Sequence, residues 1–524
     1  MCREGDDHRL TLNSVMGQDA IGVEKPLPTN TVLSPPPAML SHPESAFARL
    51  LVLAAALLLV AAPVRGAEPV APAKSTTPGR GAGANVFDPA KLHQVQVLIP
   101  RTEWDVLVRE TYVSRGGGGV DSLEDDVRRA DGRLVHIGGG FGGNFPWVHV
   151  DMTVAGKTIK DAGFRYKGNG SYTQEAGMHR SIKVKADIFG GMGDWDGLET
   201  INFNSGGRDY SRTREAMTFA IFRLAGVPAS RTAYAEVLYT VPGLHDRAYG
   251  GLFTVIENVN KAFLKHALPP GTGLLMKPER MSGGVGYYGE NWANYTAYYR
   301  PEREATAAEA QRVIEFARLV NVAPAAEFRA KIESHLDVDE FMRFLAVHAL
   351  VHARDSFLSG RHNYFIYLDP SDNRFRFIPW DEDGAMNGGM GGRDGGTGVL
   401  GIDLLWPWSA LNPLSQRLLD EPATLARYQA VICDIVAKVF NQEKLMPLVG
   451  QLEALVDKPL ALEETAMTLR GESDRANGTS PRLFLEDRFF QVQQQMAVWP
   501  KAPCLTHICL SLIHISEPTR RRGI

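Results

Sequence analysis

The chain has 524 residues, of which 44% are hydrophobic and 22% charged, and its formal net charge is −4. This length suffices for one large domain or two modest ones, and the composition is that of an ordinary globular protein. The small negative charge gives no electrostatic reason to expect nucleic acid or a general anionic surface as a partner. The sequence also contains no P-loop, Rossmann glycine pattern, HExxH motif or paired CxxC motif.

Cysteine usage gives no sign of a disulfide framework. The four cysteines are Cys2, Cys433, Cys504 and Cys509. Only Cys433 lies inside the expected folded domain, so neither a disulfide framework nor a thiol nucleophile is expected. Because Cys433 lies in the apolar run AVICDIVAKVF, we interpret it as a small buried hydrophobic residue.

Residues 1–67 are interpreted as an over-extended N-terminus followed by a signal peptide. The apolar run from Leu50 to Ala62 follows Arg49 and precedes the small residues PVRGA, a pattern typical of secretory signal peptides. The run is short for a membrane span. Signal peptides begin at the N-terminus, so Met39 is the expected start and export from the cytoplasm is expected. The alternative is an uncleaved anchor, and membrane contact is expected only through this segment.

The folded part is expected to begin with strands. Residues 68–86 are rich in Pro, Ala and Gly, which favours a flexible linker. Alternation then predicts strands in HQVQVLIP, WVHVDMTVAG, KTIKDAGFRYKG, SIKVK, YAEVLYT, YGGLFTVIENV and GTGLLMK, with a helix in RTEWDVLVRETYV. The glycine-rich segment 115–144 lacks the fixed spacing of a phosphate-binding loop, and we interpret it as a mobile surface insertion.

Two lysines and a glutamate in this part suggest phosphate chemistry. Strict alternation in SIKVK places Lys183 and Lys185 on one face of a strand. On an inner face they would need an anion to meet them, whereas on an outer face they would simply be solvated. A helix from about Arg212 to Gly226, capped by Asp209 or Ser211, carries Glu215 in its first turns. Protein kinases use such a glutamate to orient the phosphate-contacting lysine.

The second half of the chain is predicted to be helical. Helical periodicity covers 300–351 and 412–500, so the fold class is α+β, with a β-rich lobe, a helix-rich lobe and a junction at about 257–300. A glycine-rich loop at 384–401 interrupts this half. The tail 501–524 contains LSLIHISEPTR, which looks like translated sequencing-adapter read-through, and it is expected to be non-native.

The stretch from His352 to Gly384 carries the candidate catalytic residues. Asp355 follows an apolar helix, Asn363 opens a strand, and a second strand ends in the acidic sequence WDED, which contains Asp381 and Asp383. A hairpin would bring Asn363 and Asp381 to the same end of the sheet. Oxygen donors that converge in this way are typical of Mg²⁺ sites. The order of residues resembles the catalytic half of a protein kinase, although the Asp-to-Asn gap is longer than in HRDxxxxN. The alternative is a capping Asp followed by an acidic turn.

An ordered set of segments is similar to the CotH kinase family, the spore coat protein H-like secreted kinases. The set, which covers about residues 90–400, is FRYKGNGS, SIKVK, INFNSGGRDYSRTRE, GGLFTVIENVNKAFL, LLMKPE, DVDEFMRFLAVHALVHARDS, HNYFIYLD and FIPWDEDG. The resemblance implies an atypical protein-kinase-like fold within residues 87–500. It also implies transfer of the γ-phosphoryl group of ATP, with Mg²⁺ or Mn²⁺, to Ser or Thr of extracytoplasmic proteins. The glycine-rich insertions are longer than expected of the family.

The resemblance implies specific roles for eight residues. Asp355 resembles the catalytic Asp, and Asp381 resembles the metal-binding Asp, with Asp383 as its near alternative and Asn363 as the second ligand. Lys183 or Lys185 would contact the phosphates, with Glu215 as the partner on the helix. Glu257 lies at the segment that corresponds to the hinge between lobes, where the nucleotide base would stack.

Two other functions stay open at this stage. One is a non-catalytic surface or adhesion module with the same fold, which binds a metal through the WDED cluster. The other is transfer of a nucleotidyl group, which some kinase-like folds perform. The protein substrate and the oligomeric state do not follow from the sequence.

Overall fold

The computed structural model describes most of the chain between residues 81 and 499. The described residues are 81–113, 125–138, 143–168, 172, 175–207, 209–278, 284–358, 361–387, 403–407, 412–473 and 479–499. All of them belong to one unit, Val70–Ile524. The expected signal segment, most of the linker, most of the loop 384–401 and the tail 501–524 lie outside these ranges. Within them, no helix combines the length and the apolar character that crossing a membrane requires.

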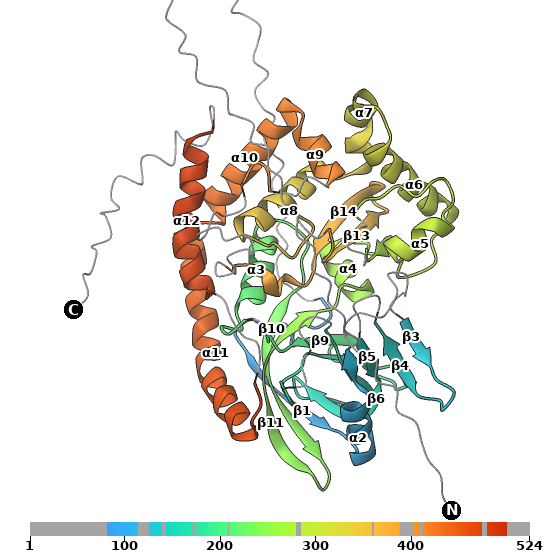
Figure 1. Cartoon of the computed structure of the whole chain (residues 1–524), viewed down its shortest axis with the longest axis vertical. Helices are drawn as coiled ribbons and strands as arrows, with labels where there is room; N and C mark the ends of the chain where they lie inside the picture. Colours follow the sequence, from blue (N-terminus) through green and yellow to red (C-terminus); the bar gives the residue numbers. More distant parts are fainter. Residues whose placement is uncertain are drawn as a thin grey trace, which may run out of the picture. The chain divides into compact units, whose positions relative to one another are not determined.

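Seven strands close into a barrel. They are β1 (Leu92–Leu98), β6 (Val148–Val154), β7 (Lys157–Tyr166), β8 (Ile182–Lys185), β9 (Thr200–Asn204), β10 (Thr232–Val241) and β11 (His245–Glu257), in the closed order β1-β10-β11-β9-β8-β7-β6 (Figure 1). β1 and β10 run parallel, and the other neighbouring strands run antiparallel. Alternation along the strands fills the barrel with buried side chains such as Phe164, Val184 and Phe203.

A small sheet and a helix lie beside the barrel. The sheet has the order β2-β5-β4-β3, and its strands are β2 (Tyr112–Val113), β5 (Gly143–Pro146), β4 (Leu134–Ile137) and β3 (Asp125–Arg128); the helix is α2 (Arg101–Glu110). The segment 115–144 was expected to be a mobile insertion, but its described part forms strands instead. Isolated apolar residues between the glycines, such as the fully buried Val135, pack these strands against the rest of the protein.

Helices surround a second sheet in the other half of the unit. This sheet has the order β12-β13-β14, formed by β12 (Leu274–Met276), β13 (Tyr364–Asp369) and β14 (Arg374–Pro379). The helices are α4 (Lys261–Ala267), α5 (Ala293–Tyr299), α6 (Ala307–Asn321), α7 (Ala325–His335), α8 (Val338–Leu350), α9 (Pro413–Leu419), α10 (Pro422–Lys438), α11 (Gln442–Arg470) and α12 (Pro481–Ala497) (Figure 1). This mixture of strands and helices confirms the α+β class.

Two large hydrophobic clusters hold these parts together. One fills the barrel, and the other joins the helices to one face of the second sheet. In the second cluster, the ring of Phe377 on β14 packs against Phe341 and Phe344 of α8, with ring centroids 4.7 and 5.6 Å apart. Asp337 caps α8, because its side chain accepts the main-chain N–H of Glu340.

The helix that carries Glu215 is α3 (Arg214–Leu224), which starts two residues later than predicted. Asp209 Oδ2 accepts the main-chain N–H of Arg214 at 2.8 Å, so this predicted residue does serve the first turn. Leu224, the last residue of this helix, is 55% exposed. Most of α3 is buried on all sides, because it lies between the barrel and the helical part.

Cys433 corrects one expectation. It lies in α10 and is 6% exposed, as predicted for a buried residue. It also forms a disulfide bond, whereas none was expected. The other three cysteines lie outside the described residues.

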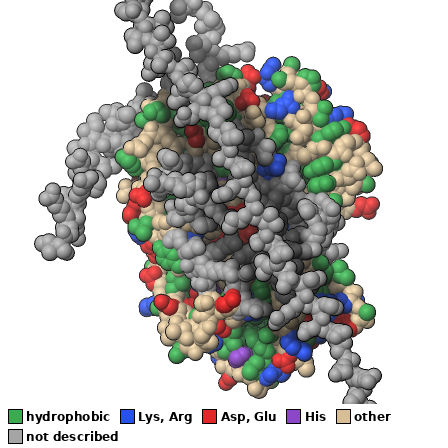
Figure 2. All heavy atoms as spheres, viewed as in Figure 1, with side chains coloured by type: hydrophobic (Ala, Val, Ile, Leu, Met, Phe, Trp, Pro, Cys, Tyr) green, Lys and Arg blue, Asp and Glu red, His purple; other side chains and the backbone are tan. Residues whose placement is uncertain are grey.

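The described surface mixes charges of both signs. Figure 2 shows acidic and basic side chains interspersed with hydrophobic and other residues on the face in view. On that face, the coloured residues do not gather into one extended patch of a single sign.

Candidate functional site

The hairpin β13–β14 brings the predicted metal-binding residues to one end of a sheet. Tyr364 pairs with Pro379 across the hairpin. One step further, the main-chain N–H of Trp380 donates to the carbonyl oxygen of Asn363 at 3.1 Å. Asn363 and Asp381 therefore flank the same end of the sheet, as the antiparallel pairing predicts.

Asp355 joins this end through its neighbours. The side-chain amide of Asn363 donates to the main-chain oxygen of Asp355 at 2.7 Å. His362 Nε2 lies 2.7 Å from Asp355 Oδ1. On the other side, a Cβ built on Gly384 would lie 3.4 Å from the Cβ of Asp355, so the chain that follows Asp383 passes close by. The three predicted residues Asp355, Asn363 and Asp381 thus lie together.

Unusual backbone conformations are concentrated here. Six non-glycine residues between positions 352 and 386, among those that the structure describes, have positive φ: His352, Arg361, Asn363, Asn373, Asp381 and Met386. All but Asn373, which lies in the turn between β13 and β14, belong to the segments around this end of the hairpin. A left-handed conformation costs most L-residues roughly 1–2 kcal/mol, so it persists only where the surroundings impose it. Such concentrations are typical of functional sites.

Glu382 differs from its two acidic neighbours because it points into the protein. Its side chain is 2% exposed, and Oε1 lies 2.9 Å from His348 Nε2. His348 Nδ1 lies 2.9 Å from the carbonyl oxygen of Phe344, which only accepts, so Nδ1 carries a proton. Burial raises the pKa of Glu382, while His348 opposes the shift. Of the WDED cluster, Asp381 is exposed and Asp383 half-buried.

A series of hydrogen-bonded polar side chains from the barrel and α3 approaches the acidic residues. Lys167 follows β7, and its Nζ donates to Asn204 Oδ1 at 2.7 Å. Asn204 Nδ2 donates in turn to Glu215 Oε2 at 2.9 Å. The Lys167 ammonium also lies 5.7 Å from the centre of the Trp380 ring, directly before Asp381. The sequence-predicted Glu215 is therefore connected to Lys167 through an amide bridge.

The charges of this series and of the acidic turn influence one another. Burial lowers the pKa of the Lys167 ammonium, while the negative charges of Asp381 and Glu215 oppose the shift. Burial raises the pKa of Glu215 well above its usual value, and the charges of Asp383 and Asp381 raise it further. The cation and the carboxylates therefore lie within electrostatic reach of each other, although they come from three separate parts of the fold.

Lys183 and Lys185 lie on the outer face of the barrel, because Ile182 and Val184 occupy its interior. In the strand register, Lys183 lies opposite Arg165 of β7 on one side and opposite Asn202 of β9 on the other. Lys185 Nζ lies 3.9 Å from Asp187. Of the two alternatives left by the sequence, the outer face is correct. A phosphate contact by either lysine stays a prediction.

Glu257 lies at the end of β11 in a buried ion-pair cluster. Its Oε1 lies 2.6 Å from Arg231 Nη2 and 2.7 Å from His266 Nε2. Although burial raises the pKa of Glu257, the bonds from His266 and Arg231 lower it overall. The carboxylate therefore anchors β11 to α4 and to the segment before β10. A nucleotide contact near Glu257 stays a prediction.

Three residues near the site were not predicted: Lys167, His362 and Lys277. Lys277 follows β12, whose Met276 pairs with Ile366 of β13, so Lys277 lies towards the Asn363 end of the sheet. Its charge also lowers the pKa of Lys167. The signals were present in FRYKGNGS, HNYFIYLD and LLMKPE, but periodicity alone does not rank these residues above Lys183.

The oxygen donors at the hairpin end fit a magnesium ion that is also bound by phosphate. Asp381 and Asp383 supply carboxylates, and Asn363 supplies an amide oxygen, because its nitrogen donates to Asp355. Within the described ranges, no group of three or more His, Cys, Asp or Glu side chains is arranged to hold a metal ion. Mg²⁺ commonly uses one or two carboxylates together with substrate phosphates and waters. The donor set therefore fits such a shared ion.

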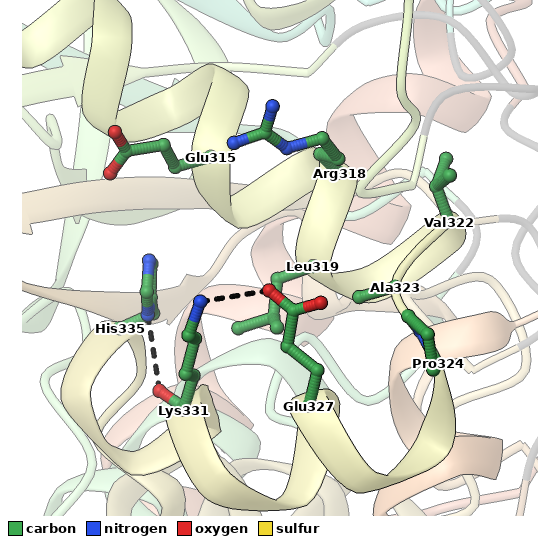
Figure 3. Close-up of a pocket in the computed structure, with 9 residues that line it drawn as sticks. All are labelled: Glu315, Arg318, Leu319, Val322, Ala323, Pro324, Glu327, Lys331 and His335. Atoms are coloured by element: carbon green, nitrogen blue, oxygen red, sulfur yellow. Dashed lines mark hydrogen bonds and ion pairs between the residues drawn. The ribbon is translucent and has the colours of Figure 1, made fainter.

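A pocket of about 460 Å³ lies elsewhere, between α6 and α7 (Figure 3). In it, Lys331 Nζ donates to Glu327 Oε1 at 2.8 Å, and His335 Nδ1 lies 3.1 Å from the carbonyl oxygen of Lys331. The ring of His335 faces Phe316, which stacks on Phe375 at the end of the hairpin away from Asp381. This pocket therefore belongs to a different region from the candidate site.

Comparison with known proteins identifies a family whose model matches this chain. Residues 164–484 match the family model described as CotH kinase protein, and this range includes all the candidate site residues. The inner spore coat protein H of Bacillus subtilis (strain 168) is similar to this chain, with 22% identity over 264 residues. The matched part is 48% of this chain and 66% of that protein, so the chain spans just under two thirds of this relative.

Proposed function

The chain belongs to the CotH kinase protein family, and from this premise we propose that it is a protein kinase. The proposed reaction transfers the γ-phosphoryl group of ATP to Ser or Thr hydroxyls of proteins outside the cytoplasm. The name of its relative, an inner spore coat protein, favours a coat or cell-surface setting. The signal segment expected before residue 68 would direct export, and it lies outside the described residues.

One observation carries the proposal. Asp355, Asn363 and Asp381 converge at one end of a hairpin. Lys167 approaches the same place, and hydrogen bonds through Asn204 connect it to Glu215. Phosphoryl transfer requires little covalent chemistry from a protein and depends mainly on positioning and charge stabilisation. A cation opposite a set of oxygen donors, beside an exposed carboxylate, provides both.

Asp355 is proposed as the acceptor of the hydroxyl proton. In the transfer, the acceptor oxygen forms a bond to the γ-phosphorus, and the bond from that phosphorus to the bridging oxygen breaks, which releases ADP. The hydroxyl proton passes to the Asp355 carboxylate, whose side chain is 54% exposed and therefore open to a protein substrate. A positioned acid or base of this kind contributes roughly 10²–10⁴ in rate.

Asp381 and Asn363 are proposed as the ligands of Mg²⁺ or Mn²⁺, with Asp383 as a further carboxylate. When bound, the ion offsets negative charge on the phosphate oxygens. The left-handed backbone at both Asn363 and Asp381 supports this role, because both side chains are held at the hairpin end by local conformation. Asn363 also ties the site to Asp355 through its amide nitrogen.

Lys167 is proposed as the lysine that contacts the phosphates, in place of Lys183 or Lys185. The side chain of Asn204 bonds to both Lys167 and Glu215, so Glu215 on α3 helps to fix the position of the Lys167 ammonium group. Lys183 and Lys185 are expected to add positive charge on the same outer face of β8.

We also propose that the barrel and the helical part correspond to the two lobes of an atypical kinase fold. The two separate hydrophobic clusters support this division. The junction is proposed at about residues 257–300, where the chain leaves β11 and enters the helical part.

The test is transfer of labelled phosphate by the purified chain. The chain is incubated with γ-labelled ATP, Mg²⁺ and a Ser-rich protein acceptor, beside Asp381→Ala and the control Asp434→Ala. Asp434 pairs with Lys438 on the surface of α10, away from the candidate site. Label with wild type and Asp434→Ala, but not with Asp381→Ala, supports the kinase.

Two outcomes would favour the alternative functions. No label, together with a metal-dependent thermal shift that Asp381→Ala removes, would favour a non-catalytic, metal-binding surface module. Label from α-labelled ATP on the acceptor, with the added mass of a nucleotide, would indicate nucleotidyl transfer instead.

A further inference from the structure

Asp355 lies on a segment without regular structure, so its orientation needs a separate cause. It is in a bend between α8 and β13, and its side chain is 54% exposed. A carboxylate on such a segment rotates freely unless neighbouring groups hold it. Proton acceptance from a hydroxyl depends on position, and a misplacement of about 1 Å costs up to about 10²-fold in rate.

His362 holds the carboxylate directly. Its Nε2 lies 2.7 Å from Asp355 Oδ1, and its side chain is 18% exposed. An ionised carboxylate only accepts hydrogen bonds, so Nε2 is the protonated nitrogen and donates. A hydrogen bond of this length to a charged oxygen belongs to the stronger class.

The chain around His362 is held in an uncommon conformation. Arg361 and Asn363, its two neighbours, have φ values of +54° and +59°. Asn adopts this region readily, but Arg does so at a cost of roughly 1–2 kcal/mol. Two bonds to the Asp355 segment oppose this cost: Arg361 N–H donates to Ser356 O at 3.1 Å, and the Asn363 amide donates to Asp355 O at 2.7 Å. The backbone therefore fixes His362 against Asp355.

We propose that His362 is a positioning residue for the proposed kinase, which orients the Asp355 carboxylate towards the acceptor Ser or Thr hydroxyl through its Nε2–H bond. This inference rests on the proposed function and adds a residue to it. His362 acts on Asp355 and not on the nucleotide, so its loss lowers the rate of transfer without weakening nucleotide binding.

A second histidine–aspartate pair supplies a matched control. His149 Nδ1 lies 2.6 Å from Asp161 Oδ1 on the β6–β7 hairpin, and both side chains are exposed. The pair has the same chemistry and a similar distance, but it lies on the barrel outside the candidate site. Its loss is expected to leave transfer unchanged.

The experiment compares steady-state kinetics of the full chain and of three variants: His362→Leu, His362→Gln and His149→Leu. His362→Leu removes the donor, and we expect kcat to fall about 10- to 100-fold while KM for ATP changes less than about two-fold. His362→Gln places an amide N–H near the position of Nε2, and it is expected to recover most of kcat. His149→Leu should match wild type.

Three results would overturn the inference. Wild-type kcat in His362→Leu would show that Asp355 needs no such bond. Equal losses in the Leu and Gln variants would show that the ring, and not the donor, matters. A parallel rise in KM for ATP, with a lowered melting temperature, would indicate a purely structural role. If the wild-type chain labels no acceptor at all, the proposed function itself fails, which is a distinguishable result.

Discussion

The carboxyl group of Glu382 and the imidazole of His348 form a buried hydrogen bond of 2.9 Å behind the exposed acidic turn. This bond joins α8 to the turn that carries Asp381, so it fixes the direction in which the hairpin end points. Because His348 Nδ1 donates to Phe344 O, a single proton is shared between Nε2 and the carboxyl group. Burial, which raises the pKa of Glu382, favours keeping that proton on the carboxyl oxygen.

This arrangement predicts different effects for two substitutions of Glu382. Glu382→Gln still donates to Nε2, and its free energy of unfolding is expected to stay within about 1 kcal/mol of wild type. Glu382→Leu leaves the buried nitrogen of His348 unpaired, and it is expected to lose about 1–3 kcal/mol. Urea unfolding at pH 7 measures both. Equal destabilisation by the two variants would show that the native pair is ionised.

The substitution Asp355→Asn is expected to slow phosphoryl transfer without weakening nucleotide binding. The amide still accepts the bond from His362 but does not take up the hydroxyl proton, so kcat is expected to fall about 10²–10⁴-fold. The thermal shift on adding Mg·ADP should remain, because Asn363 and Asp381 are untouched. Asp161→Asn, which alters the surface pair with His149, is the control. Loss of the thermal shift in Asp355→Asn would indicate that Asp355 helps to bind the nucleotide.

The lysine on the phosphates can be identified by comparison of three variants. Lys167→Met removes an ammonium group that hydrogen bonds through Asn204 connect to Glu215, and kcat/KM is expected to fall about 10²–10³-fold. Lys183→Met and Lys185→Met should lower it less, because the Lys167 ammonium lies 5.7 Å from the centre of the Trp380 ring, directly before the proposed metal ligand Asp381. The measurement is transfer to a common acceptor at fixed ionic strength. A larger loss in Lys183→Met than in Lys167→Met would reverse the assignment.

Glu463 on α11 joins the C-terminal helices to the segment before α3. It receives bonds from Arg212 Nε at 3.1 Å and from the main-chain N–H of Leu252 at 2.6 Å, and it lies 2.9 Å from His179 Nε2. Although burial raises the pKa of Glu463, His179 and Arg212 lower it from 4.5 to about 2. The charged form is thus stabilised by folding.

This shift predicts how stability depends on pH. The folded-state pKa is depressed, so the contribution is present above the ordinary pKa of 4.5 and is lost as the pH falls towards about 2. A shift of this size corresponds to about 3 kcal/mol. Unfolding free energies measured between pH 6 and pH 3 should fall more steeply for wild type than for Glu463→Gln. Glu464→Gln, an exposed neighbour, should follow wild type, and parallel curves for all three would contradict the prediction.

The sequence predicted the hairpin end well, because local rules govern it. Strand length, the Pro-Ser-Asp-Asn turn and antiparallel pairing are enough to place Asn363 beside Asp381. The composition was misleading at 115–144, where the high glycine content gave no indication of the strands β3, β4 and β5.

What the sequence by itself determined was the set of elements and the family, because alternation, turn residues and ordered motifs are properties of neighbours along the chain. Only the tertiary structure decided that Asn204 connects Lys167 to Glu215, that Glu382 turns inward to His348, and that His362 holds Asp355. These contacts depend on how the barrel, α3 and the hairpin pack against one another. Charges from distant segments meet there in a partly buried space, and no local pattern records which of several lysines or carboxylates reaches it.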